Sequence, residues 1–162
     1  MSIEMQVKGL MIDPVTNMPI IILKNSKGDA VLPIWVGIFE ANAIAMQLEN
    51  IVSPRPMTHD LLKNVIESLE SRIERVVITD LKENTFFASI HLVDGPKAVE
   101  VDARPSDAMA LALRAGAPIL VDEVVLEKST AGSEDDADSQ ETERLRRWLE
   151  TVDPQELGKY EM

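Results

Sequence analysis

Residues 99–118, which read VEVDARPSDAMALALRAGAP, predict a strand, a turn and a helix in immediate succession. The first five positions alternate apolar and acidic side chains, as in a strand with one buried face. Arg104-Pro105 then turns the chain, and the alanines and leucines that follow predict a closely packed helix from Ser106 to Ala115. Gly116 suits the left-handed position that ends many helices, and Pro118 prevents the helix from continuing.

The chain around this stretch predicts further strands joined by short turns. Three apolar runs near the N-terminus are typical of a meander, at residues 3–12, 18–24 and 31–36. Pro33 places the third run at a sheet edge or an irregularity, because proline cannot donate a ladder hydrogen bond. The other strands are expected at residues 76–78, 86–92, 99–103 and 119–121. A meander argues against the parallel sheet of a Rossmann-type fold.

Two more helices are predicted between these strands. Residues 38–48 are apolar almost all round, which indicates a buried helix. Arg55-Pro56 interrupts the chain, and Thr58 is then expected to cap a helix that runs to about Leu69. The predicted fold class is α+β: a mixed, largely antiparallel sheet with a buried helix and two Arg-Pro-initiated helices, plus a C-terminal helix.

The composition changes after residue 128. Residues 129–139 are small and acidic, which predicts a disordered linker. Residues 140–162 then show helical spacing around Trp148, so we expect a helical tail that docks on the body. The predicted organisation is one domain at residues 1–128, an acidic linker at 129–139 and a C-terminal helical tail at 140–162.

The charge balance restricts the partners of this chain. It carries 16 basic and 28 acidic residues, a net charge of −12. Residues 129–162 contribute 4 basic and 10 acidic residues, half of that net charge. A field of this sign repels nucleic acid and anionic membranes. A polyanionic substrate would therefore need a local basic patch or bridging metal ions.

The remaining composition points to a cytoplasmic protein. Cysteine is absent, which excludes disulfides, thiolate metal sites and cysteine nucleophiles and fits a reducing compartment. The N-terminus lacks the pattern of a signal peptide, and no apolar run approaches the roughly 20 residues that span a bilayer. We expect no membrane partner. We also expect a homodimer, because the early apolar strands are many for so small a core and symmetric pairs are the commonest assembly.

Two short stretches, residues 55–60 and 104–107, share an unusual pattern. Each has Arg-Pro, then a hydroxyl residue, Thr58 or Ser106, and then an aspartate at a helix start. Helix capping explains the hydroxyl and the aspartate, but a helix N-terminus is the wrong end for a cation. An arginine beside an aspartate can be an ion pair or a fork for phosphate. We therefore expect the two turns to meet, with an arginine of one bonded to an aspartate of the other.

Other polar residues are candidates for the same site. Asp102 ends a strand and Asp107 begins a helix, so the two could share a divalent cation, or Asp102 could face solvent. His59 could act as a general base, a phosphate contact or a metal ligand. Glu40, in the apolar helix, is either exposed or needs a basic partner such as Arg55 or Arg104. The sequence has no glycine-rich phosphate loop and no zinc-protease or serine-hydrolase motif.

Three stretches in order, residues 31–37, 55–61 and 101–112, together resemble the bifunctional nuclease domain family. The resemblance covers about residues 3–128. It implies an α+β domain with activity on both DNA and RNA. Carried onto this chain, the motif residues are Glu40, Arg55, His59, Asp60, Asp102, Arg104 and Asp107.

The resemblance leads us to expect a nuclease that hydrolyses DNA and RNA without strong sequence specificity, assisted by Mg²⁺ or Mn²⁺. The expected catalytic residues are His59, Asp60, Asp102 and Asp107. The three aspartates would hold the metal, and Arg55 and Arg104 would bind the phosphate. Glu40, Thr58 and Ser106 would support the site. The alternative is a non-catalytic module that recognises an anionic ligand or a protein partner through the Arg-Pro turns.

Overall fold

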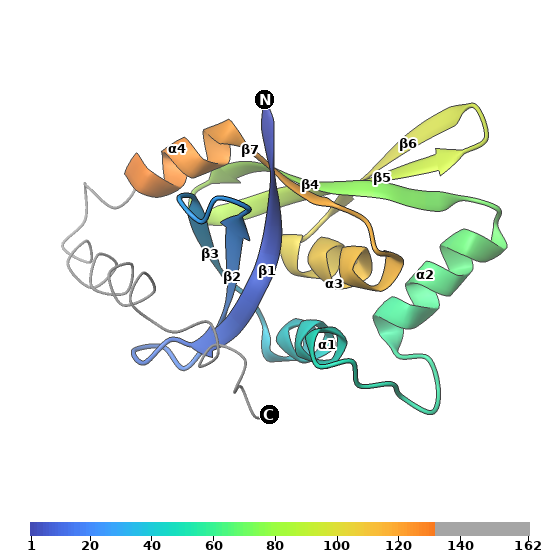
Figure 1. The fold of residues 1–162 in the computed structure, drawn as a ribbon, viewed down its shortest axis with the longest axis horizontal. Helices are drawn as coiled ribbons and strands as arrows, with labels where there is room; N and C mark the ends of the chain where they lie inside the picture. Colours follow the sequence, from blue (N-terminus) through green and yellow to red (C-terminus); the bar gives the residue numbers. More distant parts are fainter. Residues whose placement is uncertain (132–162) are drawn as a thin grey trace.

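The computed structural model describes residues 1–131, which form a single seven-stranded sheet with four helices packed on it (Figure 1). The strands lie in the order β3-β2-β1-β7-β4-β5-β6, and all neighbours are antiparallel except β4 and β7. This confirms the α+β class and the mixed, largely antiparallel sheet. The strands are β1 (Ser2–Ile12), β2 (Pro19–Asn25), β3 (Val31–Trp35), β4 (Arg72–Lys82), β5 (Thr85–Asp94), β6 (Lys97–Ala103) and β7 (Ile119–Asp122).

One helix occupies the centre of the fold. The helices are α1 (Ile38–Leu48), α2 (Thr58–Ser68), α3 (Pro105–Ala115) and α4 (Glu123–Ala131). Figure 1 shows α3 in the angle between the two halves of the sheet, β1–β3 and β4–β6. Seven residues of α3 are buried, and its alanines let it approach the strands closely. The helix predicted to be buried, α1, is covered on one side alone, because Ile38 and Phe39 are 63% and 86% exposed.

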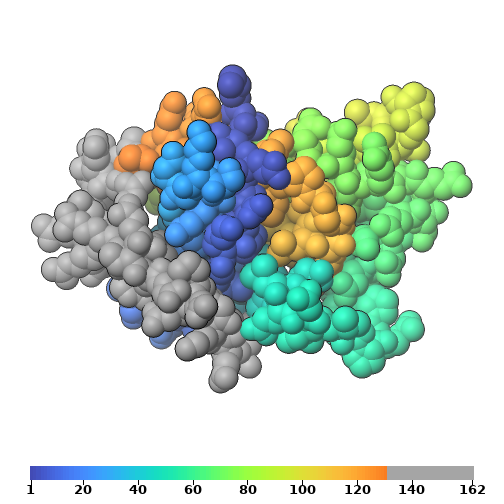
Figure 2. Space-filling view, in the orientation of Figure 1, coloured from blue at the N-terminus to red at the C-terminus, as the bar shows by residue number. Residues whose placement is uncertain are grey.

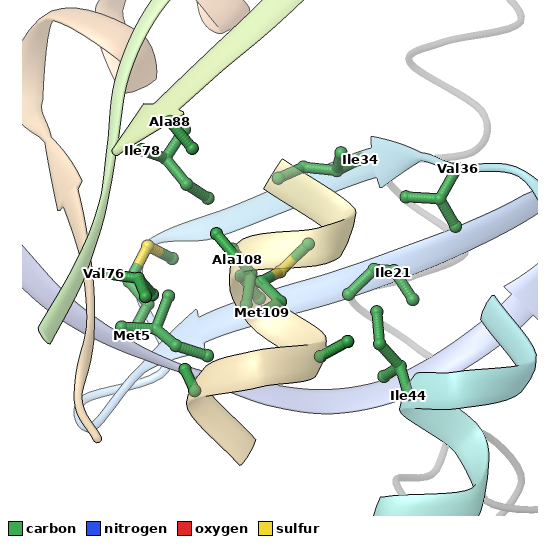
Figure 3. Packing of buried hydrophobic residues seen from close by; sticks show 14 of the residues in the cluster. Met5, Ile21, Ile34, Val36, Ile44, Val76, Ile78, Ala88, Ala108 and Met109 are labelled. Atoms are coloured by element: carbon green, nitrogen blue, oxygen red, sulfur yellow. The ribbon is translucent and has the colours of Figure 1, made fainter. Parts of the chain in front are cut away.

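The core is aliphatic and lies between α3 and the inner face of the sheet. Figure 3 shows Met109 and Ala108 of α3 among branched side chains from the strands. Ile21 and Ile78 reach this core from strands on opposite sides of β1, and both are fully buried. Alternate residues of each strand point to the same face, which is why the apolar runs of the sequence supply this layer.

Both Arg-Pro helices begin one residue earlier than expected. Thr58 is the first residue of α2, and Ser106 is the second residue of α3, so neither hydroxyl occupies the capping position. Proline at the first helical position of α3 explains the shift there, because its fixed φ suits a helix and its missing N–H is not needed. In α2 the carboxylate of Asp60 accepts the backbone N–H of Met57 at 3.0 Å.

The last described helix, α4, has no counterpart in the predictions. It continues to residue 131, so it enters the stretch that was expected to be a linker. Val125 is fully buried and attaches α4 to the core. The rest of the predicted linker and the C-terminal helix lie outside the described residues. No helix within residues 1–131 is long and apolar enough to cross a membrane.

Replacing Met109 tests the central role of α3. Met109 is fully buried, and Met109→Ala should lower the free energy of unfolding in urea by about 2–5 kcal/mol, because it leaves a cavity in the close-packed core. Met18→Ala is the matched control, since Met18 is 44% exposed and its loss should cost less than about 0.5 kcal/mol. Equal losses for the two variants would contradict this account.

Candidate functional site

The N-termini of α1, α2 and α3 meet at one place, and each carries an acid at its third helical position. These acids are Glu40, Asp60 and Asp107. An acid in the first turn is stabilised by the positive end of the helix dipole. The same three carboxylates also face cations from neighbouring elements, so the meeting point is a network of charges. Figure 2 shows α1 and the chain that leads into α2 at the surface of the molecule.

His59 joins the two Arg-Pro turns. Its Nε2 lies 2.9 Å from Oδ1 of Asp107, 48 positions along the chain. The predicted convergence of the turns is therefore confirmed, but the bond between them runs from a histidine and not from an arginine. Arg104 occupies the capping position of α3, and its Nε donates to Oδ2 of Asp107 on its own helix at 2.8 Å.

The environment of Asp107 keeps its carboxylate ionised. Burial alone would raise the pKa of Asp107, because a charged group loses solvation. The hydrogen bonds from Arg104 and His59, together with the charge of Arg104, more than offset this and lower the pKa below its usual value. Asp107 can therefore hold both partners at neutral pH.

Arg104 is fixed in place and still faces solvent. Its Nη2 donates to Oε1 of Glu40 at 2.7 Å, while its Nε donates to Asp107. Hydrogen bonds to Asp107 and then Glu40 raise the pKa of Arg104 further above its usual value. Its side chain is nevertheless 66% exposed. Such a guanidinium is suited to bind an anion, and the expected basic partner of Glu40 is confirmed as Arg104.

Arg114 is a member of the network that sequence reasoning missed. Its side chain is 5% exposed and bonds to three helices. Nε donates to Oδ1 of Asp60 in α2 at 2.6 Å, Nη2 donates to the carbonyl of Ala43 in α1 at 3.0 Å, and Nη1 donates to Ala110 of α3 at 2.9 Å. The sequence contained a sign of this role: Arg114 follows Asp107 by seven positions, which places both residues on the same face of α3.

Both carboxylate oxygens of Asp60 accept hydrogen bonds that hold the helices in place. The backbone N–H of Met57 is the strongest influence on this group, and with the hydrogen bond and charge of Arg114 it lowers the pKa of Asp60 despite the opposing effect of burial. Asp60 thus anchors the first turn of α2 to α3. This contact sets the position from which the neighbouring His59 reaches Asp107.

Asp102 lies on the other face of the sheet. Ala103 packs against the core, so the preceding residue of β6 points outward, beside Ser89 of β5. There Asp102 lines an open hollow of about 530 Å³ together with Glu100 and Phe87. The core side of the sheet holds α3 and Asp107. The structure therefore does not bring Asp102 together with Asp60 and Asp107.

The carboxylates expected to bind a metal do not fit that task in this arrangement. Each oxygen of Asp60 and of Asp107 already has a protein partner: Met57, Arg114, Arg104 or His59. Within residues 1–131, no group of three or more His, Cys, Asp or Glu side chains is arranged to hold a metal ion. Metal assistance stays a prediction.

The remaining predicted residues surround the network or lie apart from it. Arg55 is exposed and makes no hydrogen bond or ion pair among the described residues. Thr58 is exposed, and Ser106 is buried in the first turn of α3. The other histidine, His91, lies within 3.0 Å of the hydroxyl of Ser89 in β5 and takes no part in this network.

The contribution of Arg114 to stability can be tested by a substitution that keeps its positive charge. Arg114→Lys keeps the cation but cannot reach Asp60 and both carbonyl oxygens at once. We expect the free energy of unfolding to fall by about 1–3 kcal/mol, because buried acceptors lose their donors. The control is Arg72→Lys, at an exposed position, which should change the free energy by less than about 0.5 kcal/mol. An unchanged free energy of unfolding in Arg114→Lys would show that the three contacts do not hold the helices together.

The stability of the protein should depend on pH through Asp107. Folding lowers the pKa of Asp107 from 3.8, so the ionised carboxylate stabilises the folded protein at pH values above 3.8. This stabilisation is lost as the pH falls through the lower pKa of the folded state. Urea unfolding between about pH 7 and about pH 3 should therefore show a steeper loss for the wild type than for Asp107→Asn. Parallel curves for the two proteins would count against the ionised Asp107.

Comparison with known proteins identifies the same family that the sequence motifs suggested. The family model described as the bifunctional nuclease domain matches residues 21–134. An uncharacterised protein of Mycobacterium tuberculosis is 37% identical over 162 residues, which cover 95% of this chain and 97% of that relative.

Plant proteins match a shorter stretch. Bifunctional nuclease 1 of rice (Oryza sativa subsp. indica) is 30% identical over 105 residues, and Bifunctional nuclease 2 of Arabidopsis thaliana is 29% identical over 105 residues. Each match covers 62% of this chain, and the chain spans about a third of these plant relatives, 32% of their length. The family model covers well over half of the sequence, from within β2 to the end of α4, and includes all the residues of the charge network. The chain belongs to the bifunctional nuclease domain family.

Proposed function

We propose that this protein hydrolyses phosphodiester bonds of DNA and RNA without strong sequence specificity. Membership of the family and the names of the plant relatives, which are bifunctional nucleases, support the reaction class. The observation that carries the proposal is the chain of contacts His59–Asp107–Arg104–Glu40, in which Arg104 is an exposed cation. Because His59 and Arg104 share Asp107, the proposal assigns them the neighbouring roles of base and phosphate contact.

His59 is the proton acceptor in this proposal. A carboxylate is acceptor-only, so the hydrogen between His59 and Asp107 belongs to Nε2 of the ring. The lone pair is then on Nδ1, which takes a proton from the water that attacks phosphorus. As the new P–O bond forms and the ester P–O bond breaks, the negative charge of Asp107 stabilises the imidazolium. The leaving oxygen takes a proton from solvent.

Arg104 is the phosphate contact. Two carboxylates fix its orientation before a substrate arrives, and its Nη1, which has no partner within residues 1–131, is left for a phosphate oxygen. A preoriented guanidinium can stabilise the extra negative charge that develops on phosphate in the transition state. The predicted contact of Arg55 with the phosphate stays a prediction, since Arg55 has no partner in the described part of the chain.

Binding of nucleic acid should be weak. The one exposed cation of this network, Arg104, is already paired with Glu40 and Asp107, and the whole chain is at −12. Few phosphates can be neutralised by such a surface, so binding should change little with salt. These features fit an enzyme that acts on any accessible strand better than a sequence-specific binder.

Matched substitutions test the proposal. Asp107→Asn and His59→Gln should each reduce cleavage of a fluorescent single-stranded oligonucleotide by about 10²–10⁴-fold, because each removes part of the proton transfer. Asp102→Asn and His91→Gln are the controls, since they change the same residue types outside the charge network and should leave cleavage unchanged. If all three aspartates bind one metal, Asp102→Asn should instead lose activity with Asp107→Asn.

Two further measurements complete this test. Cleavage by the wild type with EDTA and with added Mg²⁺ or Mn²⁺ examines the predicted metal assistance. Activity must also vary with the substitutions in equally pure preparations, because trace nucleases are very active. Cleavage of equal rate in wild type, His59→Gln and Asp107→Asn would refute the proposed reaction.

A non-catalytic module is the second candidate, and one observation favours it. The side chain of His59 is 12% exposed, while that of Arg104 is 66% exposed. The anion contact is thus open to solvent where the base is largely covered. Binding of a labelled oligonucleotide that depends on Arg104 but leads to no cleavage would support this alternative.

A further inference from the structure

The helix α2 carries a row of exposed apolar side chains. No residue of α2 is buried, although the helix is amphipathic. Met57, Leu61, Val65 and Leu69 recur every four residues from the N-cap to the C-cap, and their exposed fractions are 37%, 56%, 46% and 70%. Residues spaced by four form one ridge along a helix. We call these four residues the α2 ridge.

The core of the protein does not explain the α2 ridge. The opposite side of α2 makes the contacts with the body, through His59 on Asp107 and through Ile66, which packs against the core. Figure 1 shows α2 at the end of the molecule away from α4, at the outer edge of the fold. An exposed apolar strip of this kind marks an interaction surface.

We propose that the α2 ridge is a self-association surface, on which α2 of one molecule packs antiparallel to α2 of a second copy about a two-fold axis. A two-fold interface must be complementary to itself. The α2 ridge meets this condition, because reversing it places Met57 opposite Leu69 and Leu61 opposite Val65.

The charges around the α2 ridge favour the same partner. Thr58, Asn64 and Ser68 flank the ridge and are uncharged, as expected for the centre of an interface. Residues 54–72 hold three basic and three acidic side chains and so have no net charge, whereas the whole chain has a net charge of −12. Two copies therefore meet with little repulsion on this face.

The ends of the α2 ridge are complementary in an antiparallel pair. Arg55 precedes the ridge, and Glu70 follows it. The two-fold arrangement sets Arg55 of each molecule near Glu70 of its partner and opposes the two helix dipoles. This inference gives Arg55 a partner that residues 1–131 of one molecule do not provide. It does not rest on the proposed nuclease activity, because the ridge points away from His59.

Sedimentation of the full chain over about 10 µM to about 1 mM, the range of weak dimers, tests the proposal. The wild type should approach twice its mass of 18.0 kDa. The double variant Leu61→Gln/Val65→Gln should stay monomeric with an unchanged melting curve, since both side chains are exposed. Ile51→Gln/Val52→Gln, at exposed apolar positions outside the ridge, should dimerise like the wild type.

A charge exchange tests the antiparallel geometry. Arg55→Glu should weaken the dimer, and adding Glu70→Arg to it should restore the wild-type mass. A wild type that stays monomeric over the whole range would overturn the proposal, and the ridge would then belong to another partner or to none. A dimer that survives Leu61→Gln/Val65→Gln would also overturn it, because a different face would hold the copies together.

Discussion

The carboxylate of Asp107 is the contact on which the arrangement of the helices depends. One oxygen holds His59 of α2, and the other holds Arg104, which in turn reaches Glu40 of α1. Three helix N-termini would otherwise bring three positive dipole ends together. An acid at the third position of each helix offsets this. The cations that these acids attract then tie the helices to one another, and Arg114 does the same from within α3.

This network is the basis on which the proposed function assigns a phosphate contact to an acidic protein. Asp107 and Glu40 orient Arg104, whose side chain stays 66% exposed and whose pKa they raise. His59 is oriented by the same aspartate. His59 and Arg104, the base and the phosphate contact of the proposed function, are therefore both positioned by Asp107.

Three surfaces of the molecule have separate origins. The charge network lies where the helix N-termini meet, the hollow with Asp102 lies on the outer face of the sheet, and the α2 ridge lies on the outer side of α2. The strict alternation of a strand separates Asp102 from Asp107, although they are five positions apart in the sequence. The period of a helix likewise separates His59 from the ridge.

The sequence by itself determined the α+β class, the N-terminal meander, the edge position of Pro33 and the end of α3 at Gly116, because these follow from local periodicity and backbone preference. It also marked the two Arg-Pro turns as a place where polar groups gather. It did not determine which groups bond: His59 meets Asp107 across 48 positions, and Arg114 meets Asp60 across 54. It also left open which helix would be central and which face would carry Asp102. Only the tertiary structure decided these points, because a contact between distant residues depends on how the whole chain packs and not on the pattern of either segment.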